Sequence, residues 1–305
     1  MEVADSERHS AKLHGEALGT KAIKVQWPLS DLIFQIIAAS ALVLGLVVVC
    51  TLLLDIFYDG FSRLSWDFFT SYPSRFPDKA GIKSALVGSF YLMILIIIFS
   101  FPLGVGSAIY LEEYAPNNKF TRIIELNIAN LAGVPSVIYG ILGLQLFIRG
   151  LNFERSLLSG ALTLTMLILP VIIIASREAI RAVPKALREA SLALGASKWQ
   201  TIQSHVIPGA LPGIMTGCIL AFSRAIGETA PLITIGALTY IAFLPDSIFS
   251  PFTALPIQTY NWISRPQQAF HTNAAAAITV LLVVLLAMNA IAIFLRIRYQ
   301  NRAKH

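Results

Sequence analysis

The stretch "VPKALREASLALGASKWQTIQSHVIPGALPG", residues 183–213, is a polar interruption between two long apolar runs. Helix-forming residues extend to Leu194, and a second short helical pattern covers residues 197–204. Gly195 lies between them, and glycine adopts a left-handed turn conformation without a steric penalty. We therefore predict a compact helix-turn-helix at a membrane surface, with Pro208 opening the next apolar run. A connector that only covers helix ends is the simpler alternative.

The composition around this stretch is that of an integral membrane protein. The 305 residues are 56% hydrophobic and only 13% charged, with a mean hydropathy of +0.70. Soluble domains carry roughly one quarter charged residues. About twenty apolar residues in a helix cross a hydrocarbon core of ~30 Å. We predict an all-α polytopic protein with six spans, at about residues 32–57, 84–111, 126–148, 157–180, 206–238 and 272–297.

The fifth apolar run, residues 206–238, is longer than a span needs and contains several glycines and prolines. This pattern predicts a tilt, a kink or a break, with the outer end as the least defined boundary. The first run is too long for a cleavable signal and follows a polar tail of about thirty residues, so we expect a retained anchor.

The predicted domain organisation is simple. We expect a polar cytoplasmic tail over residues 1–30, a six-helix transmembrane domain over 31–298 and a short cytoplasmic tail over 299–305. Two external segments, about 58–83 and 244–270, are expected to be irregular, because prolines at their density exclude a continuous helix.

Lysine and arginine set the predicted orientation. When both termini and the second and fourth loops lie on one side, that side collects fifteen cations against seven on the other, and Arg224 is left within a span. The positive-inside rule then puts both termini in the cytoplasm. The net charge of +6 is therefore mostly a signal of topology and gives little support to nucleic-acid binding.

Residues that carry chemistry in soluble enzymes give no enzyme pattern. Cys50 and Cys218 both lie in apolar spans, where a small hydrophobic side chain packs well, and the five histidines show no ligand spacing. We expect neither a disulfide nor a metal site. The GxxxxGK[ST] pattern is missing from the sequence, which excludes nucleotide hydrolysis of the P-loop kind.

One charged pair lies deep in the fifth run. In "FSRAIGETAP", residues 222–231, Arg224 and Glu228 are four positions apart and can face each other on one helix surface. An arginine near the centre of a spanning helix costs about 3 kcal/mol. One interpretation is a buried salt bridge that clamps the helix to a neighbour. The other is an arginine that lines an anion path, with Glu228 limiting how tightly it binds.

The stretch "EASLALGASKWQTIQSHVIP", residues 189–208, resembles the EAA loop of ATP-binding cassette importer permeases. Its motif matches at Glu189, Ala190, Gly195 and Pro208, whereas Ser191 replaces the second Ala and His205 replaces the usual Ile. The resemblance implies a coupling helix that docks on a separate ATPase subunit, which binds ATP and Mg, so this chain itself holds no cofactor. The expected coupling residues are Glu189, Ala190, Ser191, Gly195, Lys198 and Pro208.

Further motifs resemble the PstA-type permease subunits of phosphate importers. These are "GIMTGCILAFSRAIGETAPLITIGA" (213–237), "NLAGVPSVIYGILGL" (130–144) and "YLEEYAP" (110–116), and the resemblance extends from about residue 58 to the last span. It implies a type I ABC importer permease fold in the bacterial inner membrane, importing phosphate delivered by a periplasmic binding protein. The implied partners are a PstC-like permease, two PstB-like ATPase copies, a PstS-like phosphate-binding protein and membrane lipid.

The same resemblance suggests which side chains meet the substrate. Arg224, Glu228 and Thr229 are the expected path residues. Many relatives carry another arginine soon after the proline of span four, but residues 171–175 are apolar here and Arg177 is the first cation. Arg177 is either that arginine displaced by about one turn or, as we favour, an interfacial residue reaching the cytoplasm.

Several other functions are compatible with parts of the sequence. A permease for another oxyanion such as sulfate needs the same cation in the path. A stand-alone channel or ion-coupled carrier is another alternative, but it needs no EAA-like loop. An intramembrane enzyme has little support, because the spans of this sequence lack a cluster of His, Cys or carboxylates. Glu112 and Glu113, at the end of span two, are expected to anchor that span at the cytoplasmic interface.

Overall fold

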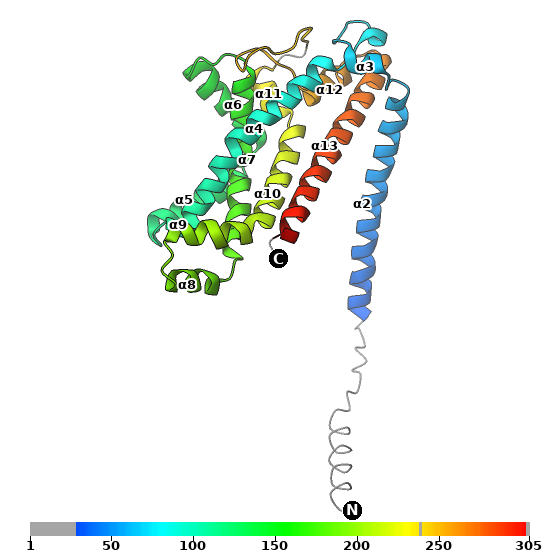
Figure 1. Cartoon of the computed structure of the whole chain (residues 1–305). Helices are drawn as coiled ribbons and strands as arrows, with labels where there is room; N and C mark the ends of the chain where they lie inside the picture. The colour runs from blue at the N-terminus through cyan, green and yellow to red at the C-terminus, as the bar shows by residue number, and fades with distance from the viewer. Residues whose placement is uncertain (1–28, 238–239, 303–305) are drawn as a thin grey trace, which may run out of the picture. The chain divides into compact units, whose positions relative to one another are not determined.

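The computed structural model describes residues 29–237 and 240–302 (Figure 1). Most of the two predicted tails, 1–30 and 299–305, lies outside the described residues. The chain divides into two compact units, residues 1–54 and 55–305. The helix α2 (Leu29–Phe61) begins in the first unit. It contains no charged residue between Asp31 and Asp55. At 1.5 Å per residue, its 33 residues reach about 50 Å, more than a bilayer core requires.

Five of the predicted spans are long apolar helices. Besides α2 they are α4 (Lys83–Ile109), α7 (Leu157–Arg181), the helix that ends in α10 (Ile207–Gly227), and α13 (Gln268–Arg302). A wider, π-helical turn, η2 (Tyr110–Tyr114), continues α4. The apolar runs therefore predicted the position and type of these elements, and α13 continues as helix into the segment expected to be a tail.

The third predicted span is a bent pair of helices and not one continuous helix. Its residues form α5 (Lys119–Ala132) and α6 (Ser136–Gly143), continued by the π-helical segment η3 (Leu144–Gly150), with a bend of 106° between the two. Pro135 lacks an N–H and disfavours helix at the residue before it. The chain therefore turns at residues 133–135, and an apolar composition alone could not show it.

The fifth predicted span breaks, as its glycines and prolines indicated. α10 ends at Gly227, and α11 (Ala230–Ile235) begins after Glu228 and Thr229. At the other end, α9 (Lys198–Thr201) and the π-helical η4 (Ile202–Val206) run directly into α10 and make one helix of 30 residues. The second short helix of residues 197–204 is thus part of the span, because a wide turn before Pro208 accommodates its missing N–H.

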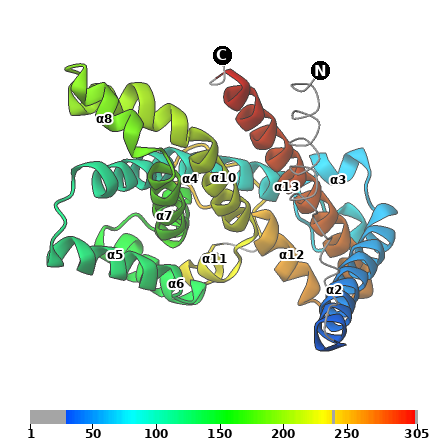
Figure 2. The ribbon, with the colours of Figure 1, turned by 90° about the horizontal axis from the view of Figure 1, so that it is seen from below.

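α7 is the central helix of the second unit and packs against both α4 and α10, and the three helices lie close together in Figure 2. Small residues let these helices approach closely. A Cβ on Gly104 of α4 would meet Ile172 Cγ2 at 2.5 Å, and one on Gly217 of α10 would meet Ala175 Cβ at 2.3 Å. Such small-residue contacts are the usual way in which membrane helices gain van der Waals contact.

The end of this unit opposite α8 (Lys185–Ala193) is better ordered than its prolines predicted (Figure 1). It contains α3 (Trp66–Thr70), the 3-10 turn η1 (Pro77–Lys79) and α12 (Leu255–Ile263). Phe68, Leu255 and Trp262 form a second apolar core there. Pro256 lies in the first turn of α12, where a missing N–H costs no intrahelical bond.

Candidate substrate path and coupling loop

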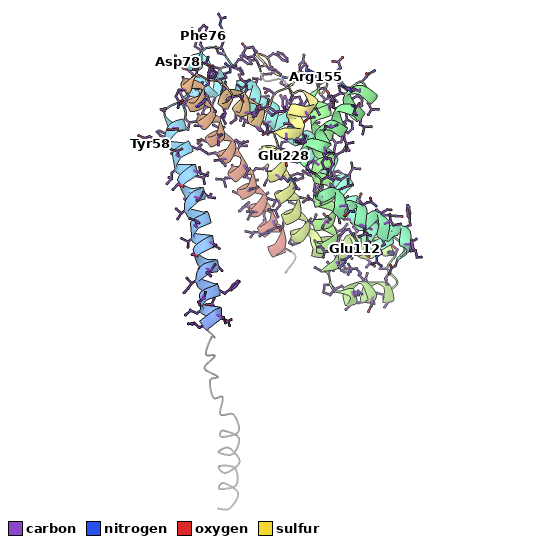
Figure 3. The ribbon with its side chains drawn as sticks, turned by 180° about the vertical axis from the view of Figure 1, so that it is seen from behind. Tyr58, Phe76, Asp78, Glu112, Arg155 and Glu228 are labelled. Carbon is purple, nitrogen blue, oxygen red and sulfur yellow. The ribbon has the colours of Figure 1, made fainter. Side chains whose placement is uncertain are left out.

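Arg224 and Glu228 form the ion pair that their spacing predicted. Arg224 Nε donates to Glu228 Oε1 at 3.0 Å. Arg224 lies in the last turn of α10, and Glu228 is the first residue beyond it, with an extended backbone. In Figure 3 Glu228 lies at a level between Glu112, near α8, and Arg155, at the opposite end. The pair is therefore positioned by the break in the fifth span.

The two side chains differ in exposure. Arg224 is 43% exposed and Glu228 only 16%. Within the described residues, the ion-pair partner of Arg224 is the residue directly after its own helix, so the pair does not clamp α10 to another helix of this chain. An arginine facing hydrocarbon costs about 3 kcal/mol or more. Its exposed face therefore requires a polar surface, either water or another protein subunit.

Thr229 follows Glu228 in the break and is half-buried. Its hydroxyl donates to the Gly227 carbonyl at 3.4 Å, a long and hence weak hydrogen bond. The backbone at Glu228 and Thr229 therefore separates two helix ends, and these two polar residues follow Arg224 by four and five positions.

The helix-turn-helix predicted for the EAA-like loop is present in α8, Gly195 and α9. Gly195 has a φ of +84°, in the left-handed region. Ser197 and Gln200 form a reciprocal capping box at the start of α9, with bonds of 2.8 and 3.3 Å. The Ser191 and Thr201 hydroxyls lie 2.9 Å apart and join α8 to α9.

The remaining expected coupling residues are at the surface. Glu189, Ala190, Lys198 and Pro208 are exposed, and Lys198 Nζ lies 5.1 Å from the centre of the Tyr114 ring. Large apolar side chains are exposed on and around the same loop, namely Leu187, Leu192, Leu194 and Trp199. Apolar side chains gathered on a polar loop are typical of a protein-binding surface.

His205 does not disturb the packing of the helix. It lies in the π-helical turn η4 and is exposed, whereas its neighbours Ile202 and Val206 are buried. Its position, the one where the EAA pattern usually has Ile, therefore faces away from the core of this chain.

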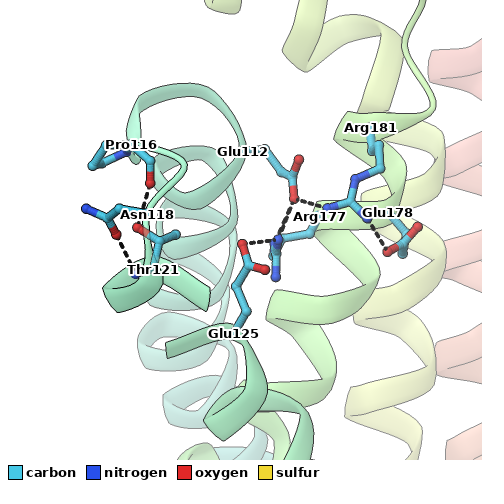
Figure 4. Close-up of polar contacts among 8 residues, drawn as sticks. All are labelled: Glu112, Pro116, Asn118, Thr121, Glu125, Arg177, Glu178 and Arg181. Atoms are coloured by element: carbon cyan, nitrogen blue, oxygen red, sulfur yellow. Dashed lines mark hydrogen bonds and ion pairs between the residues drawn. The ribbon is translucent and has the colours of Figure 1, made fainter. Parts of the chain in front are cut away.

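Arg177 is neither a water-exposed interfacial residue nor a free cation. Its side chain is only 11% exposed. Nε donates to Glu112 Oε1 at 2.8 Å and Nη2 donates to Glu125 Oε1 at 2.7 Å (Figure 4). Two carboxylates therefore hold the guanidinium, which corrects our expectation that it extends into the cytoplasm.

Glu112 is the centre of these contacts and also accepts from Arg181 Nη2 at 2.7 Å (Figure 4). Glu125 is brought near by the turn before α5, where Asn118 Oδ1 accepts from the Thr121 N–H at 2.8 Å. The sequence analysis missed this cluster, because Glu112 and Glu125 are 65 and 52 residues from Arg177 and no spacing rule connects them.

This fold is shared with permeases of known structure. An alginate ABC transporter, solved with an alginate-bound periplasmic protein, matches with a TM-score of 0.64 at 15% identity, over 86% of this chain and 93% of that chain. The MetNI methionine ABC transporter, in an inward-facing conformation, matches with a TM-score of 0.55 at 18% identity, over 72% of this chain and 94% of the other. At such identities the likeness shows the fold alone.

Residues 100–302 match the model of the family described as "Binding-protein-dependent transport system inner membrane component". The chain belongs to this family, and within it to the PstA type of ABC permease. Membership makes it a membrane permease subunit of an ABC importer, a class that works with a binding protein and an ATPase.

Relatives agree with this assignment. The "Probable ABC transporter permease protein YqgI" of Bacillus subtilis is 36% identical over 77% of this chain and 85% of its own length. PstA of Haemophilus influenzae, a phosphate transport system permease protein, is 30% identical over 86% of this chain and 91% of its own. PstA 1 of Mycobacterium tuberculosis (strain H37Rv) is 35% identical over 73% of this chain and 71% of its own length.

Proposed function

We propose that this chain is the permease subunit through which inorganic phosphate crosses a bacterial inner membrane. The single observation that carries the proposal is the half-exposed Arg224, held by Glu228 at the break of the fifth span. Several relatives named as phosphate transport permeases support the choice of anion.

The geometry of the pair suits brief binding of an oxyanion. Glu228 accepts the hydrogen bond from Arg224 Nε. Among the described residues, neither Nη1 nor Nη2 of Arg224 has a partner. The two terminal nitrogens can donate two hydrogen bonds to one phosphate group. Glu228 partly neutralises the cation and so weakens its hold, which a path needs if the ion is to leave again.

The partners follow from the same proposal. A PstC-like permease faces Arg224 across the path, a PstS-like phosphate-binding protein delivers the ion, and two copies of a PstB-like ATPase bind ATP and Mg. One ATPase contacts α8 through Glu189 and the exposed apolar side chains around it. This orientation puts α8 and both termini in the cytoplasm, as the lysines and arginines favour.

Energy from the ATPase reaches the path along one helix. α9, η4 and α10 are continuous from Lys198, beside the turn at Gly195, to Gly227, next to Glu228. A shift of the loop therefore shifts Arg224 too. The spans then alternate between states open to opposite sides of the membrane.

A second oxyanion, sulfate, is the alternative substrate. Phosphate at neutral pH retains a hydroxyl group that can donate a hydrogen bond to the Glu228 carboxylate. Sulfate has no such donor. A site built around such an acceptor rejects the analogue that lacks the donor. Replacing Glu228 by Gln, which can itself donate, is expected to reduce the discrimination against sulfate.

Phosphate uptake by the complex of this chain with its partner permease, ATPase and binding protein, reconstituted in vesicles, tests the proposal. Arg224→Gln is expected to lower uptake by about tenfold or more, the effect of losing one charge-assisted interaction of about 1.5–3 kcal/mol. Arg122→Gln removes an exposed cation of α5 and is the matched control. Normal uptake by Arg224→Gln contradicts the path role, and uptake without any ATPase indicates a carrier or channel instead.

A further inference from the structure

The helix α8 is attached to the rest of the permease by polar side chains rather than by an apolar core. Of its nine residues only Ser191 is buried. A cavity of about 270 Å³ beside it is lined entirely by charged residues, which are Glu112, Glu113, Arg181, Lys185, Arg188 and Glu189. Motion of α8 therefore reaches the spans through individual hydrogen bonds and ion pairs.

Arg188, in the middle of α8, makes the most extensive of these attachments. Its Nη2 donates to the Ile180 carbonyl in the last turn of α7 at 2.8 Å, and its Nη1 donates to the Val183 carbonyl, just beyond α7, at 2.7 Å. Its Nε donates to Glu113 Oε1, in η2 at the end of α4, at 2.9 Å. One guanidinium thus joins three elements.

Both partners of this ion pair are withdrawn from water. The side chain of Arg188 is 18% exposed and that of Glu113 is 10% exposed. Screening by salt is weaker for such a pair than for a surface pair. The rigid planar fork also fixes the angle between α8 and α7, which a single flexible ammonium cannot do.

A second attachment of α8, through Ser191, is weaker. There the Ser191 and Thr201 hydroxyls form one neutral hydrogen bond to α9. Charge-assisted bonds are roughly twice as strong as neutral ones. The attachment of α8 to α7 and η2 is therefore stronger than its attachment to α9.

The Arg188 contact is continuous with the Arg177 cluster. Glu112 and Glu113 are consecutive in η2; Glu112 binds Arg177 and Arg181 of α7, and Glu113 binds Arg188 of α8. η2 is thus held by arginines from two different helices, and α5 joins through Glu125.

We propose that Arg188 is a positioning residue that makes α8, the end of α7 and η2 move as one unit when the ATPase moves α8. The inference rests on the proposed function, since it takes α8 as the ATPase contact. It adds that motion enters the permease through α7 and α4, as well as through the continuous helix that leads to Arg224.

The first test measures phosphate imported per ATP hydrolysed by the reconstituted complex. Arg188→Met keeps the length and apolar stem of the side chain and removes every donor. We expect the ratio to fall about fivefold or more, a typical coupling between sites, while ATP hydrolysis continues. Glu113→Ala leaves the two carbonyl bonds and gives a smaller loss. Arg122→Gln, which removes an exposed cation of α5 away from α8, is the control and leaves the ratio unchanged.

The second test measures a distance. Spin labels at Lys185→Cys on α8 and Asn117→Cys after η2, with Cys50 and Cys218 replaced by Ala, report whether the two elements move together. With Arg188 present, the distance stays the same when a nonhydrolysable ATP analogue binds the ATPase. With Arg188→Met it changes, because α8 then moves alone.

A changing distance in the presence of Arg188, or a normal ratio in Arg188→Met, overturns the inference. If Arg188→Met does not assemble, the same measurements are made on Glu113→Ala. A normal ratio of phosphate to ATP and an unchanged spin-label distance in that variant also overturn the inference. A wild-type complex that imports no phosphate contradicts the proposed function. The distance measurement still tests whether Arg188 attaches α8 to α7 and η2, because it needs only a docked ATPase.

Discussion

Gly236 and Arg155 share a small space at the end of α11. Gly236 has a φ of +81°, and a Cβ there would lie 3.0 Å from Arg155 Nε and 3.1 Å from its Cδ. Both the backbone conformation and the contact therefore require glycine. Nothing in the local sequence shows that an arginine 81 positions earlier limits this residue, because the two meet only in the folded chain.

Replacing Gly236 by Ala is expected to destabilise the protein. A left-handed conformation costs a non-glycine residue about 1–2 kcal/mol, and the Arg155 side chain must also shift. The melting temperature of the purified chain in detergent should fall by about 2–6 °C. Gly106→Ala in α4 is the control, because no atom lies within 4 Å of its added Cβ. Equal stability of the two variants contradicts the prediction.

Among the elements, the packing of α7 against α10 depends on the smallest side chains. Gly213 faces Ala179 and Gly217 faces Ala175, one turn apart along the same contact. The helices meet where an added methyl group has no room, and their closeness sets the position of α10 and so of Arg224. The glycines of the fifth span therefore serve packing in its inner part and the break at its outer end.

Gly217→Ala is expected to lower stability, because its Cβ would lie 2.3 Å from Ala175 Cβ and the helices must separate. Overpacking of this kind costs about 1–3 kcal/mol. The double variant Gly217→Ala with Ala175→Gly restores the space and should recover most of the loss in thermal unfolding. A double variant no more stable than Gly217→Ala alone would show that this contact does not limit the helix distance.

At the scale of the whole molecule, the second unit has different surfaces at its two ends. The end with α8 exposes Leu194 at 89% and Trp199 at 53%, next to a network of arginines and glutamates. The opposite end has its own apolar core, secured by Arg63, which donates to Asn273 Oδ1 and to three carbonyls between Pro77 and Ala80. One end thus suits the docking of a partner, and the other is a fixed cap.

Leu194→Glu is expected to abolish assembly with the ATPase while leaving the permease folded. The side chain is almost fully exposed, so the substitution disturbs no packing in this chain, but it puts a charge in the proposed interface. Retention of the ATPase during purification should fall about tenfold or more, as at the central residues of other interfaces. Lys119→Glu, at an exposed position of α5, should retain it. Full retention by Leu194→Glu would place the docking surface elsewhere.

The amino-acid sequence by itself determined the class of this protein, five of its long helices, the turn at Gly195 and the pairing of Arg224 with Glu228. These features depend on local properties: the length of an apolar run, the conformational range of glycine, and a separation of one helical turn. The EAA-like and GETAP motifs likewise placed the chain in its family without a structure.

Only the tertiary structure decided the bend of 106° in the third span, the close contact of α7 with α10, and the roles of Arg177 and Arg188. The carboxylate partners of these arginines lie 52 to 75 residues away in the chain. An ion pair forms between atoms a few ångströms apart in space, whatever their distance in sequence. Such pairs follow from how the helices pack, which local patterns do not specify.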